Sequence, residues 1–589
     1  MTPPQEMSLV DKARQELETS ISGHLNIIID MKHKLNQLTV TAKLPPEILT
    51  EIFVHYVAAE SKITTHDKLK PYVWVRITHV CHHWREVALT SPRVWSTIFV
   101  TGSSCVDEML SRSKKVPLDV FAGYSISRVG STEKIRTVLR QLERIRRLEL
   151  HYSPSIKLGD LPTAAPLLKT LLIKGADESS LSPSGNNFMD AFERCDMPIL
   201  ECLELTYSKM LWTSRLLRPT LTSLVFGHAR SAASSHTSLF TVLRTLDSMP
   251  LLQRLDIRNV LPRVNEASEV ANIIHLVTLD RLSDLRVTDW GLSCAQLLSN
   301  LSFPGNTALI FDCELLESHM RTVCDAFASK LSSTNNGDRP NPILSVSLYS
   351  TPYTTTGLRG WHKVHPIEKL ATPELIPAPH FDFAIRLPTH SVVVQQLFEA
   401  LPLSSIQSLY VDSTPAWDFS LSKDAWMKSF ASLIQLRQLS VGSWGEYALP
   451  EVLSSRIPLS TEPTRKGGRR RMQPFFPKLS VLRFENTRLR DPYNPGDNRL
   501  IAGYRKAFQK RKKSRAELER LVIRRCLNFF AQDMSMFDGV VKEVDWDQLE
   551  EVDEPETDTE MYEDFDDLMD PWDEEDDFIP WDFPGAFLF

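Results

Sequence analysis

The chain has 589 residues, a formal net charge of −7 and eight cysteines. One hydrophobic core cannot organise this length, so we expect several domains or an elongated repeat array. No run of residues approaches the roughly 18 apolar positions that a bilayer span requires, and the N-terminus lacks the basic-then-apolar order of a secretory signal. Because the cysteines form no C-x-x-C pair, the composition excludes a disulfide scaffold and predicts a protein of the cytoplasm or nucleus.

Residues 8–38 carry apolar side chains at two positions of a 3.5-residue period over about four heptads. One position holds Val10, Leu17, Met31 and Leu38, and the other holds Ile21, Ile28 and Leu35. Arg14 and His24 interrupt the pattern, and Gly23 weakens a helix by up to about 1 kcal/mol. Two interpretations of residues 1–42 stay open: a coiled coil that self-associates, or a single helix lying on the domains that follow. Four imperfect heptads are marginal alone, which favours the second.

Two apolar helical segments come next, at residues 44–57 and 74–98. The first reads LPPEILTEIFVHYV, in which two prolines suit the opening turn of a helix. Its apolar stripe consists of Ile48, Leu49, Ile52, Phe53, Tyr56 and Val57. The second reads WVRITHVCHHWREVALTSPRVWSTI, and its apolar face consists of Ile77, Val80, Cys81, Trp84 and Ala88. The polar residues 58–73 between them predict a surface loop.

In order, spacing and residue types, these segments resemble the F-box family, in the variant with an LPPEIL start and a VC-xx-WR-xx-A finish. The resemblance implies a small helical module at residues 43–100 that docks on the Skp-type adaptor of a cullin–RING (SCF) ubiquitin ligase. The rest of the chain would then hold the protein to be ubiquitinated. By position, the residues implied to contact the adaptor are Leu44, Pro45, Ile48, Leu49, Ile52, Phe53, Val80, Cys81, Trp84 and Arg85.

The residues themselves also call for a partner. A module of this size cannot bury two such stripes alone, so part of its apolar surface must meet another protein. The alternative is an ordinary helical hairpin within a larger core.

From residue 140 onward one pattern returns: an aliphatic residue, two variable ones, Leu or Val, one variable, then an aliphatic residue or Phe. The copies begin at Ile145, Leu168, Leu200, Leu221, Leu252, Leu282, Ile343, Ile406, Leu436, Leu479 and Leu518. A proline stands two residues before five of them, at Pro166, Pro198, Pro219, Pro250 and Pro477. The copies from 145 to 282 lie 21 to 32 residues apart, and two wider gaps of 61 and 63 residues follow. Residues 238–247 and 393–401, between copies, have helical periodicity.

This pattern resembles leucine-rich repeats, although the asparagine that follows the strand in regular repeats is missing. It predicts an α/β fold, a leucine-rich-repeat-like solenoid over residues 101–540 whose parallel sheet presents a concave outer face. Leu203, Leu255 and Leu285 should then be buried and equivalent. Glu204, Asp256 and Arg286 should point outward. The alternative is a generic α/β domain with chance leucine motifs.

Charge is separated along the chain. Residues 543–582 include 21 acidic residues and no Lys or Arg, so basic residues outnumber acidic ones elsewhere. The basic surplus concentrates in residues 465–471 and 505–525. The tail, residues 541–589, is predicted to be disordered. Because aromatic residues such as Trp572 and Trp581 interleave its acids, docking on a partner or on the chain's own basic segments stays open beside a free, solvated tail.

No catalytic or cofactor-binding motif appears: there is no phosphate-binding glycine loop, no H-E-x-x-H and no G-x-S-x-G. The triplet Cys81-His82-His83 cannot converge on one metal ion, because adjacent helical residues point about 100° apart. We therefore expect no cofactor and no active site, but a non-catalytic, substrate-recognition subunit of a ubiquitin ligase. Two alternatives are an F-box scaffold without a role in ubiquitination and a nucleic-acid-associated protein that uses residues 505–525.

Overall fold

The computed structural model places the chain in two compact units, one ending at Leu200 and the other beginning at Glu201. We call them the N-terminal unit and the C-terminal unit. The described residues are 9–66, 72–100, 105–122, 131–152, 161–175, 186–206, 211–228, 237–271, 274–332, 341–351, 355–370, 372, 375–387, 390–411, 421–442, 447–458, 472–490 and 496–552.

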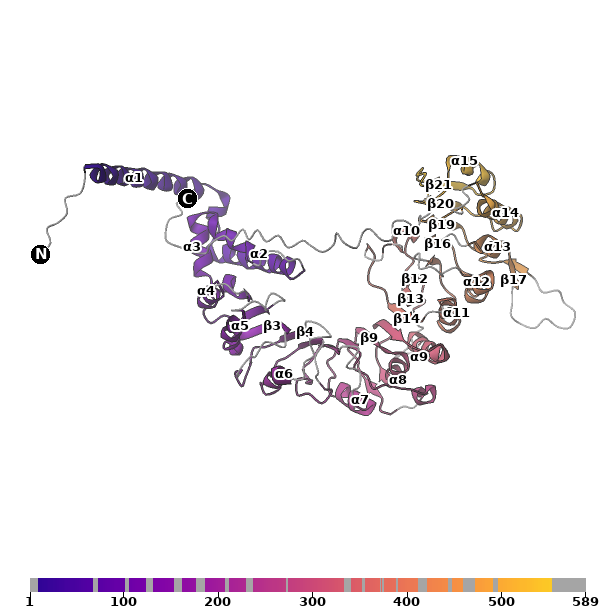
Figure 1. Cartoon of the computed structure of the whole chain (residues 1–589), viewed down its shortest axis with the longest axis horizontal. Helices are drawn as coiled ribbons and strands as arrows, with labels where there is room; N and C mark the ends of the chain where they lie inside the picture. The colour runs from indigo at the N-terminus through magenta and orange to yellow at the C-terminus, as the bar shows by residue number, and fades with distance from the viewer. Residues whose placement is uncertain are drawn as a thin grey trace, which may run out of the picture. The chain divides into compact units, whose positions relative to one another are not determined.

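Helices make up the first part of the N-terminal unit, as the sequence predicts (Figure 1). They are α1 (Leu9–Gln37), η1 (Val40–Lys43), α2 (Pro46–His66), η2 (Val73–His79), α3 (His82–Thr90) and η3 (Pro92–Trp95), where η denotes a 3-10 helix. Two details differ from the prediction. Residues 58–66 continue α2 instead of forming a loop, since they contain no proline or glycine. The second segment is not one helix, because Cys81 is extended, with φ of −159°, between η2 and α3.

A parallel sheet forms the rest of the N-terminal unit. Its strands are β1 (Thr97–Phe99), β2 (Leu118–Ala122), β3 (Ile145–Tyr152) and β4 (Thr170–Gly175), accompanied by α4 (Cys105–Arg112), α5 (Ser131–Leu139), η5 (Leu142–Arg144) and α6 (Asn186–Glu193). The strands pair in chain order, with Val120 in register with Leu148, and Leu148 with Leu171. All three side chains are buried, so alternate residues of each strand enter the core.

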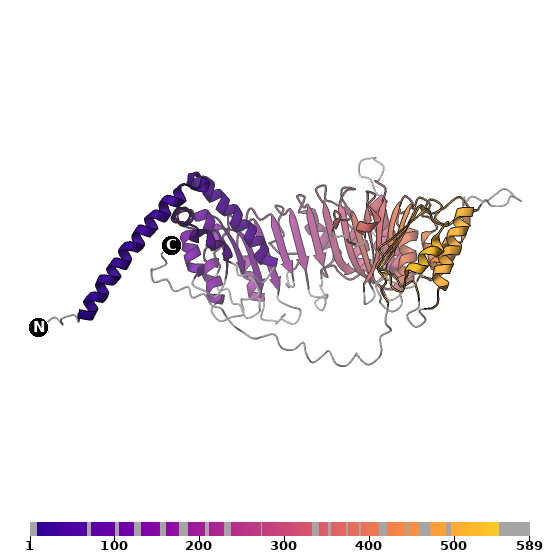
Figure 2. The ribbon, with the colours of Figure 1, turned by 90° about the horizontal axis from the view of Figure 1, so that it is seen from above.

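A longer sheet runs through the C-terminal unit, and Figure 2 shows its strands side by side. They are β5 (Cys202–Thr206), β6 (Ser223–Gly227), β7 (Arg254–Arg258), β9 (Asp284–Trp290), β11 (Ala308–Glu314), β12 (Ser345–Thr351), β13 (Thr355–Trp361), β14 (Phe381–Arg386), β15 (Ser408–Val411), β16 (Gln438–Gly442), β19 (Val481–Glu485), β20 (Arg520–Arg524) and β21 (Glu543–Trp546). Two small pairs lie outside it, β8 (Val277–Thr278) with β10 (Leu301–Ser302) and β17 (Arg456–Pro458) with β18 (Met472–Pro474).

Helices cover one face of this sheet (Figure 1). They are α7 (Leu239–Asp247), α8 (Gly291–Ser299), α9 (Met320–Ser332), α11 (His390–Ala400), α12 (Lys423–Phe430), α13 (Leu449–Leu453) and α14 (Arg499–Lys513). From α8 to α14, each helix packs against the next in this series. The helical periodicity of residues 238–247 and 393–401 is confirmed by α7 and α11. Shorter turns complete the unit, η9 (Ala267–Ala271), η10 (Glu317–His319), α15 (Ala531–Met534) and η12 (Ser535–Phe537).

Each of the eleven copies of the repeated pattern places a strand in a sheet. The strand begins two residues after the start of the copy in ten of them, and at Ile145 itself in the first. The expected equivalence of three leucines is confirmed: Leu203, Leu255 and Leu285 share one register line across β5, β6, β7 and β9, and each is at most 1% exposed. Asp256 and Arg286 share the neighbouring line, on the other face of the sheet. The chain is therefore a helical N-terminus followed by a large mixed α/β region with long sheets.

Strand order departs from chain order at one place in the C-terminal unit. The sheet runs β11, β14, β13, β12, β15, and β13 is antiparallel to both of its neighbours. The wide gaps after Leu282 and Ile343 contain β11 and β14, two strands that no copy of the pattern marks. The additional strand β13 arises because the chain turns back after β12 as a hairpin, which the spacing of the pattern does not foretell.

The segment between β13 and β14 folds over the face opposite the helices. Its short helix α10 (Ile367–Leu370) contacts β15 and β16. A buried cluster joins this segment to the sheet, made of Trp361, Leu370, Ile376 and Tyr410. The indole of Trp361 donates to the carbonyl oxygen of Pro377 at 2.9 Å. This part of the outward face is therefore covered by the chain itself.

The sheet continues past residue 541, where the acidic tail was expected to begin. Strand β21 pairs with β20, so residues 541–552 belong to the fold. The remaining tail, residues 553–589, and the basic residues 465–471 lie outside the described residues. Among the described residues, no helix combines the length and the apolar character that crossing a membrane would demand.

Candidate functional site

The helical module of residues 43–100 has an apolar core. Leu49 and Phe53 of α2 are 0% and 1% exposed. They share this core with Trp74, whose ring meets that of Trp95 edge-on at 5.3 Å between centroids. The indole of Trp95 donates to the carbonyl oxygen of Ala88 at 2.7 Å, which ties η3 to α3. This packing fixes the directions of α2 and α3.

Polar contacts between elements reinforce the same arrangement. The hydroxyls of Thr50 and Ser91 lie 2.7 Å apart, linking α2 to the end of α3. The guanidinium of Arg76 donates to the hydroxyl of Tyr56 at 2.6 Å and forms an ion pair of 3.2 Å with Glu60. These contacts hold η2 against α2, so the module presents a defined surface.

Part of the apolar stripe predicted for α2 does not enter the core. Ile48 and Ile52 are 48% and 45% exposed, and Pro45 is exposed beside them at the start of the helix. Ile48 and Ile52 stand four residues apart, so they lie on one side of α2. Val80, in the break before α3, is 59% exposed. We call Pro45, Ile48, Ile52 and Val80 the apolar face.

The structure thus divides the ten residues proposed to contact an adaptor. Leu49 and Phe53 are buried within the module. Leu44, Cys81 and Trp84 are partly exposed, and Arg85 is exposed. The rings of Phe53 and Trp84 meet at 5.1 Å between centroids, which joins α2 to α3 beneath the surface. Sequence reasoning missed Val73, which begins η2 and is 38% exposed. No apolar periodicity in the residues before it could have marked it.

The outward face of the sheet in the N-terminal unit carries a cluster of charges around Glu149. Lys174 and Arg147 lie 3.2 and 3.3 Å from its carboxylate, and His151 lies 3.8 Å away. Burial alone would raise the pKa of Glu149, but the hydrogen bond to His151 and the charge of Lys174 lower it to about 2. Glu149 is therefore held as a carboxylate.

Similar clusters line the outward face in the C-terminal unit. Asp256 is only 1% exposed, because Arg258 and Arg254 pair with it at 2.8 and 3.7 Å. Further along, Arg359 pairs with Asp382 at 2.9 Å. The expectation that Asp256 points outward holds for its direction, while its exposure is removed by its neighbours. On this face, acidic and basic side chains lie next to one another and hold each other in place through ion pairs.

The basic residues 505–525 are less available than their sequence suggests. Arg511 is 1% exposed and donates to the carbonyl oxygens of Phe475 and Phe476 at 2.7 and 2.8 Å, and burial lowers its pKa to about 10. In β20, Arg524 pairs with Asp545 of β21 at 2.6 Å. The first acidic residues of the expected tail therefore neutralise part of this basic segment.

A metal site would need several His, Cys, Asp or Glu side chains that converge on one point. No group of three or more such side chains among the described residues is arranged to hold a metal ion. Cys81 precedes α3, whereas His82 begins it.

The comparison with known families agrees with this geometry. Residues 41–101 match the family model described as F-box-like. No curated protein matches the chain. The match covers the core, the apolar face and both helices described above, so residues 41–101 of this chain form an F-box-like domain.

Proposed function

We propose that the chain is the substrate-recognition subunit of an SCF-type ubiquitin ligase, with its F-box-like domain bound to a Skp-type adaptor and, through it, to a cullin. The observation that carries this proposal is the apolar face. Exposed aliphatic residues are normal singly, but a set on one rigid surface is typical of a docking site. F-box domains in general bind such adaptors.

The ten residues would act in two groups. Leu44, Pro45, Ile48, Ile52, Val80, Cys81, Trp84 and Arg85 would contact the adaptor directly. Leu49 and Phe53 would support the contact from below, because truncating either would leave a cavity that lets α2 move. Exposed anchors of this kind usually dominate the affinity of an interface.

For the rest of the chain we propose a leucine-rich-repeat-like solenoid that holds a protein substrate. The support is the regular register of the strands, with helices on one face and fixed charges on the other. A charged, rigid surface suits a partner of complementary charge pattern. The subunit itself would carry out no reaction, and its ligase would act in the cytoplasm or nucleus.

The test is affinity purification of the full-length protein with and without the changes Ile48→Glu and Ile52→Glu. Both side chains are nearly half exposed, so the charges should leave the fold intact and remove the apolar contact. We expect adaptor and cullin to be lost, with affinity for the purified adaptor falling at least about thirtyfold, equivalent to some 2 kcal/mol.

The matched control is Leu211→Glu with Phe240→Glu, two side chains of the C-terminal unit that are 56% and 50% exposed. This control should keep the adaptor. Equal adaptor binding by both double variants would overturn the proposed contact.

A second readout separates a ligase subunit from a scaffold. A protein that co-purifies through the C-terminal unit should accumulate when cullin activity is blocked, and it should accumulate equally with the Ile48→Glu, Ile52→Glu variant. A bound protein whose level never responds to cullin activity would indicate the scaffold instead.

A further inference from the structure

Helix α1 exposes an apolar stripe, which Arg14 and His24 interrupt. Leu17, Ile21, Met31 and Leu35 are 65%, 58%, 63% and 65% exposed. The described residues of the F-box-like domain do not cover this stripe, although the ring of His33 approaches that of His82 at 5.2 Å between centroids. The interpretation of α1 as a helix lying with its apolar side on that domain is therefore not what the structure shows.

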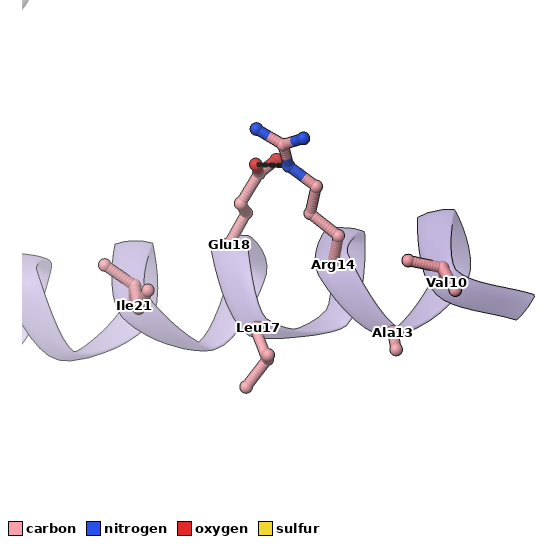
Figure 3. Close-up of a pocket in the computed structure, with 6 residues that line it drawn as sticks. All are labelled: Val10, Ala13, Arg14, Leu17, Glu18 and Ile21. Carbon is pink, nitrogen blue, oxygen red and sulfur yellow. Dashed lines mark hydrogen bonds and ion pairs between the residues drawn. The ribbon is translucent and has the colours of Figure 1, made fainter.

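The stripe follows a heptad pattern along the whole helix. Counting the two apolar heptad positions as a and d, position a holds Arg14, Ile21, Ile28 and Leu35, and position d holds Val10, Leu17, His24, Met31 and Leu38. The helix has 29 residues, a length of about 43 Å at 1.5 Å per residue. Figure 3 shows its first part, where Ala13 and Leu17 point to one side and Arg14 reaches toward Glu18. Such a seam fits another helix with the same spacing.

Charge decides between the two ways in which a second copy of α1 could pair. In a parallel pair, each residue meets its own copy, so Arg14 would lie against Arg14 and His24 against His24 in the core. The two Arg14 guanidinium groups would repel each other at this distance, and no charged residue of either flank would meet an opposite charge.

An antiparallel pair removes the repulsion. Leu17 then lies opposite Leu35 of the second copy, and Ile21 opposite Met31. Arg14 lies opposite Leu38, at the end of the seam, and His24 opposite Ile28, so neither meets its own copy. On the flanks, Glu18 lies opposite Lys32. By symmetry, each of these contacts occurs twice.

The residues beside the middle of the seam agree with this orientation. Leu25 and Ile27 flank it, and Ile27 is 56% exposed. In the antiparallel pair each meets its own copy, so that apolar surface is buried against apolar surface. In the parallel pair Ile27 would face Lys32 and Leu25 would face Ser20.

We propose that α1 is a dimerisation helix that binds α1 of a second copy of this chain as an antiparallel coiled coil. The dimer would carry two F-box-like domains. This goes beyond the proposed adaptor contact and does not depend on it, because the apolar face lies along the start of α2 and in the break before α3.

The first test measures the mass of the purified full-length protein by sedimentation over concentrations up to about 100 µM, which detects a micromolar Kd. We expect a dimer. Ile21→Glu with Ile28→Glu should weaken it at least about a hundredfold, because four glutamates would enter each core. The control Thr19→Glu with Asn26→Glu adds the same charge on the opposite side of α1 and should leave the dimer intact. A wild-type monomer, or a dimer that ignores Ile21 and Ile28, would overturn the proposal.

Gly23 supplies an independent variant that leaves the seam unchanged. A Cβ atom there meets nothing within 4 Å. Gly23→Ala should therefore stabilise the helix by up to about 1 kcal/mol in each chain. The dimer Kd should fall about fivefold for each of the two chains that carries the change. Weaker dimerisation by Gly23→Ala would contradict a helical contact.

The second test fixes the orientation by disulfide formation. Leu17→Cys mixed with Leu35→Cys should cross-link under mild oxidation, whereas either variant alone should not. In the antiparallel pair, two copies of residue 17 lie about 27 Å apart, which no disulfide spans. Cross-linking of each variant with itself would overturn the antiparallel geometry. Loss of adaptor binding by Ile21→Glu with Ile28→Glu in a protein that is monomeric throughout would assign the stripe to the adaptor and refute the dimer.

Discussion

At the residue scale, Glu149 shows how a buried charge on the outward face is made tolerable. Three basic side chains surround it, and two of them, Arg147 and Lys174, are themselves partly exposed. A carboxylate taken out of water would otherwise cost several kcal/mol. The cluster therefore fixes local geometry more than it adds net stability.

This arrangement predicts how stability depends on pH. The pKa of Glu149 is lowered to about 2 in the folded state, so its stabilising contribution is complete above the unfolded pKa and is lost as pH falls toward 2. Glu149→Gln should cost about 1–2 kcal/mol at neutral pH, less than a fully buried pair because its partners reach solvent. Hydrogen exchange of β3 amides over a urea titration gives the free energy of unfolding of each protein. The difference in this free energy between wild type and Glu149→Gln should shrink as the pH is lowered from 5 to 2. A difference that is constant over this range would exclude the ionised carboxylate as its cause.

Burial was predictable at most core residues, because the repeated pattern marks the inward positions. Leu148, Leu203 and Leu409, which occupy the same place in their copies, are all at most 1% exposed. The exposure of Ile48 and Ile52 was not predictable. They belong to the same sequence stripe as Leu49 and Phe53, and only the packing of η2 and α3 decides which side is covered.

At the element scale, β13 is the feature that sequence reasoning missed. Its glycines allow close contact with both neighbouring strands: a Cβ atom on Gly357 would lie 2.2 Å from the ring of Tyr349, and one on Gly360 would lie 2.1 Å from the ring of Phe381. Because β13 carries little apolar sequence of the repeated pattern, it cannot be recognised by that pattern. The strands β11 and β14 lie in the two wide gaps between copies, and no copy of the pattern marks them.

The close approach predicts a specific sensitivity. Gly360→Ala should destabilise the C-terminal unit by about 1–3 kcal/mol, since Phe381 is 0% exposed and has no room to move. Gly227→Ala is the matched control, a strand glycine whose added Cβ would have its nearest neighbour at 3.4 Å. It should be neutral or slightly stabilising. Urea midpoints from far-UV circular dichroism would compare the two, and equal midpoints would show that the β13 contact is not tight.

At the scale of the whole molecule, the order of the helical module and the strands along the chain was predictable from the sequence. Which side chains are exposed or paired could be read only from the structure. The F-box-like match and the parallel strands appear where the residue patterns place them. Strand β21 lies beyond the boundary expected at 541, because Asp545 pairs with arginines of β20 that the charge count treats as a free basic segment. Composition records how many charges a segment has, not which of them meet.

The adaptor contact is the central claim, and hydrogen exchange of the full-length protein with and without a purified Skp-type adaptor tests it most directly. We expect slower exchange in peptides from residues 44–57 and 72–90, because the apolar face and its supporting helices would lose their local opening when bound. Strands β5 to β21 should be unchanged. Protection confined to those strands, or none within residues 41–101 at saturating adaptor, would contradict the account.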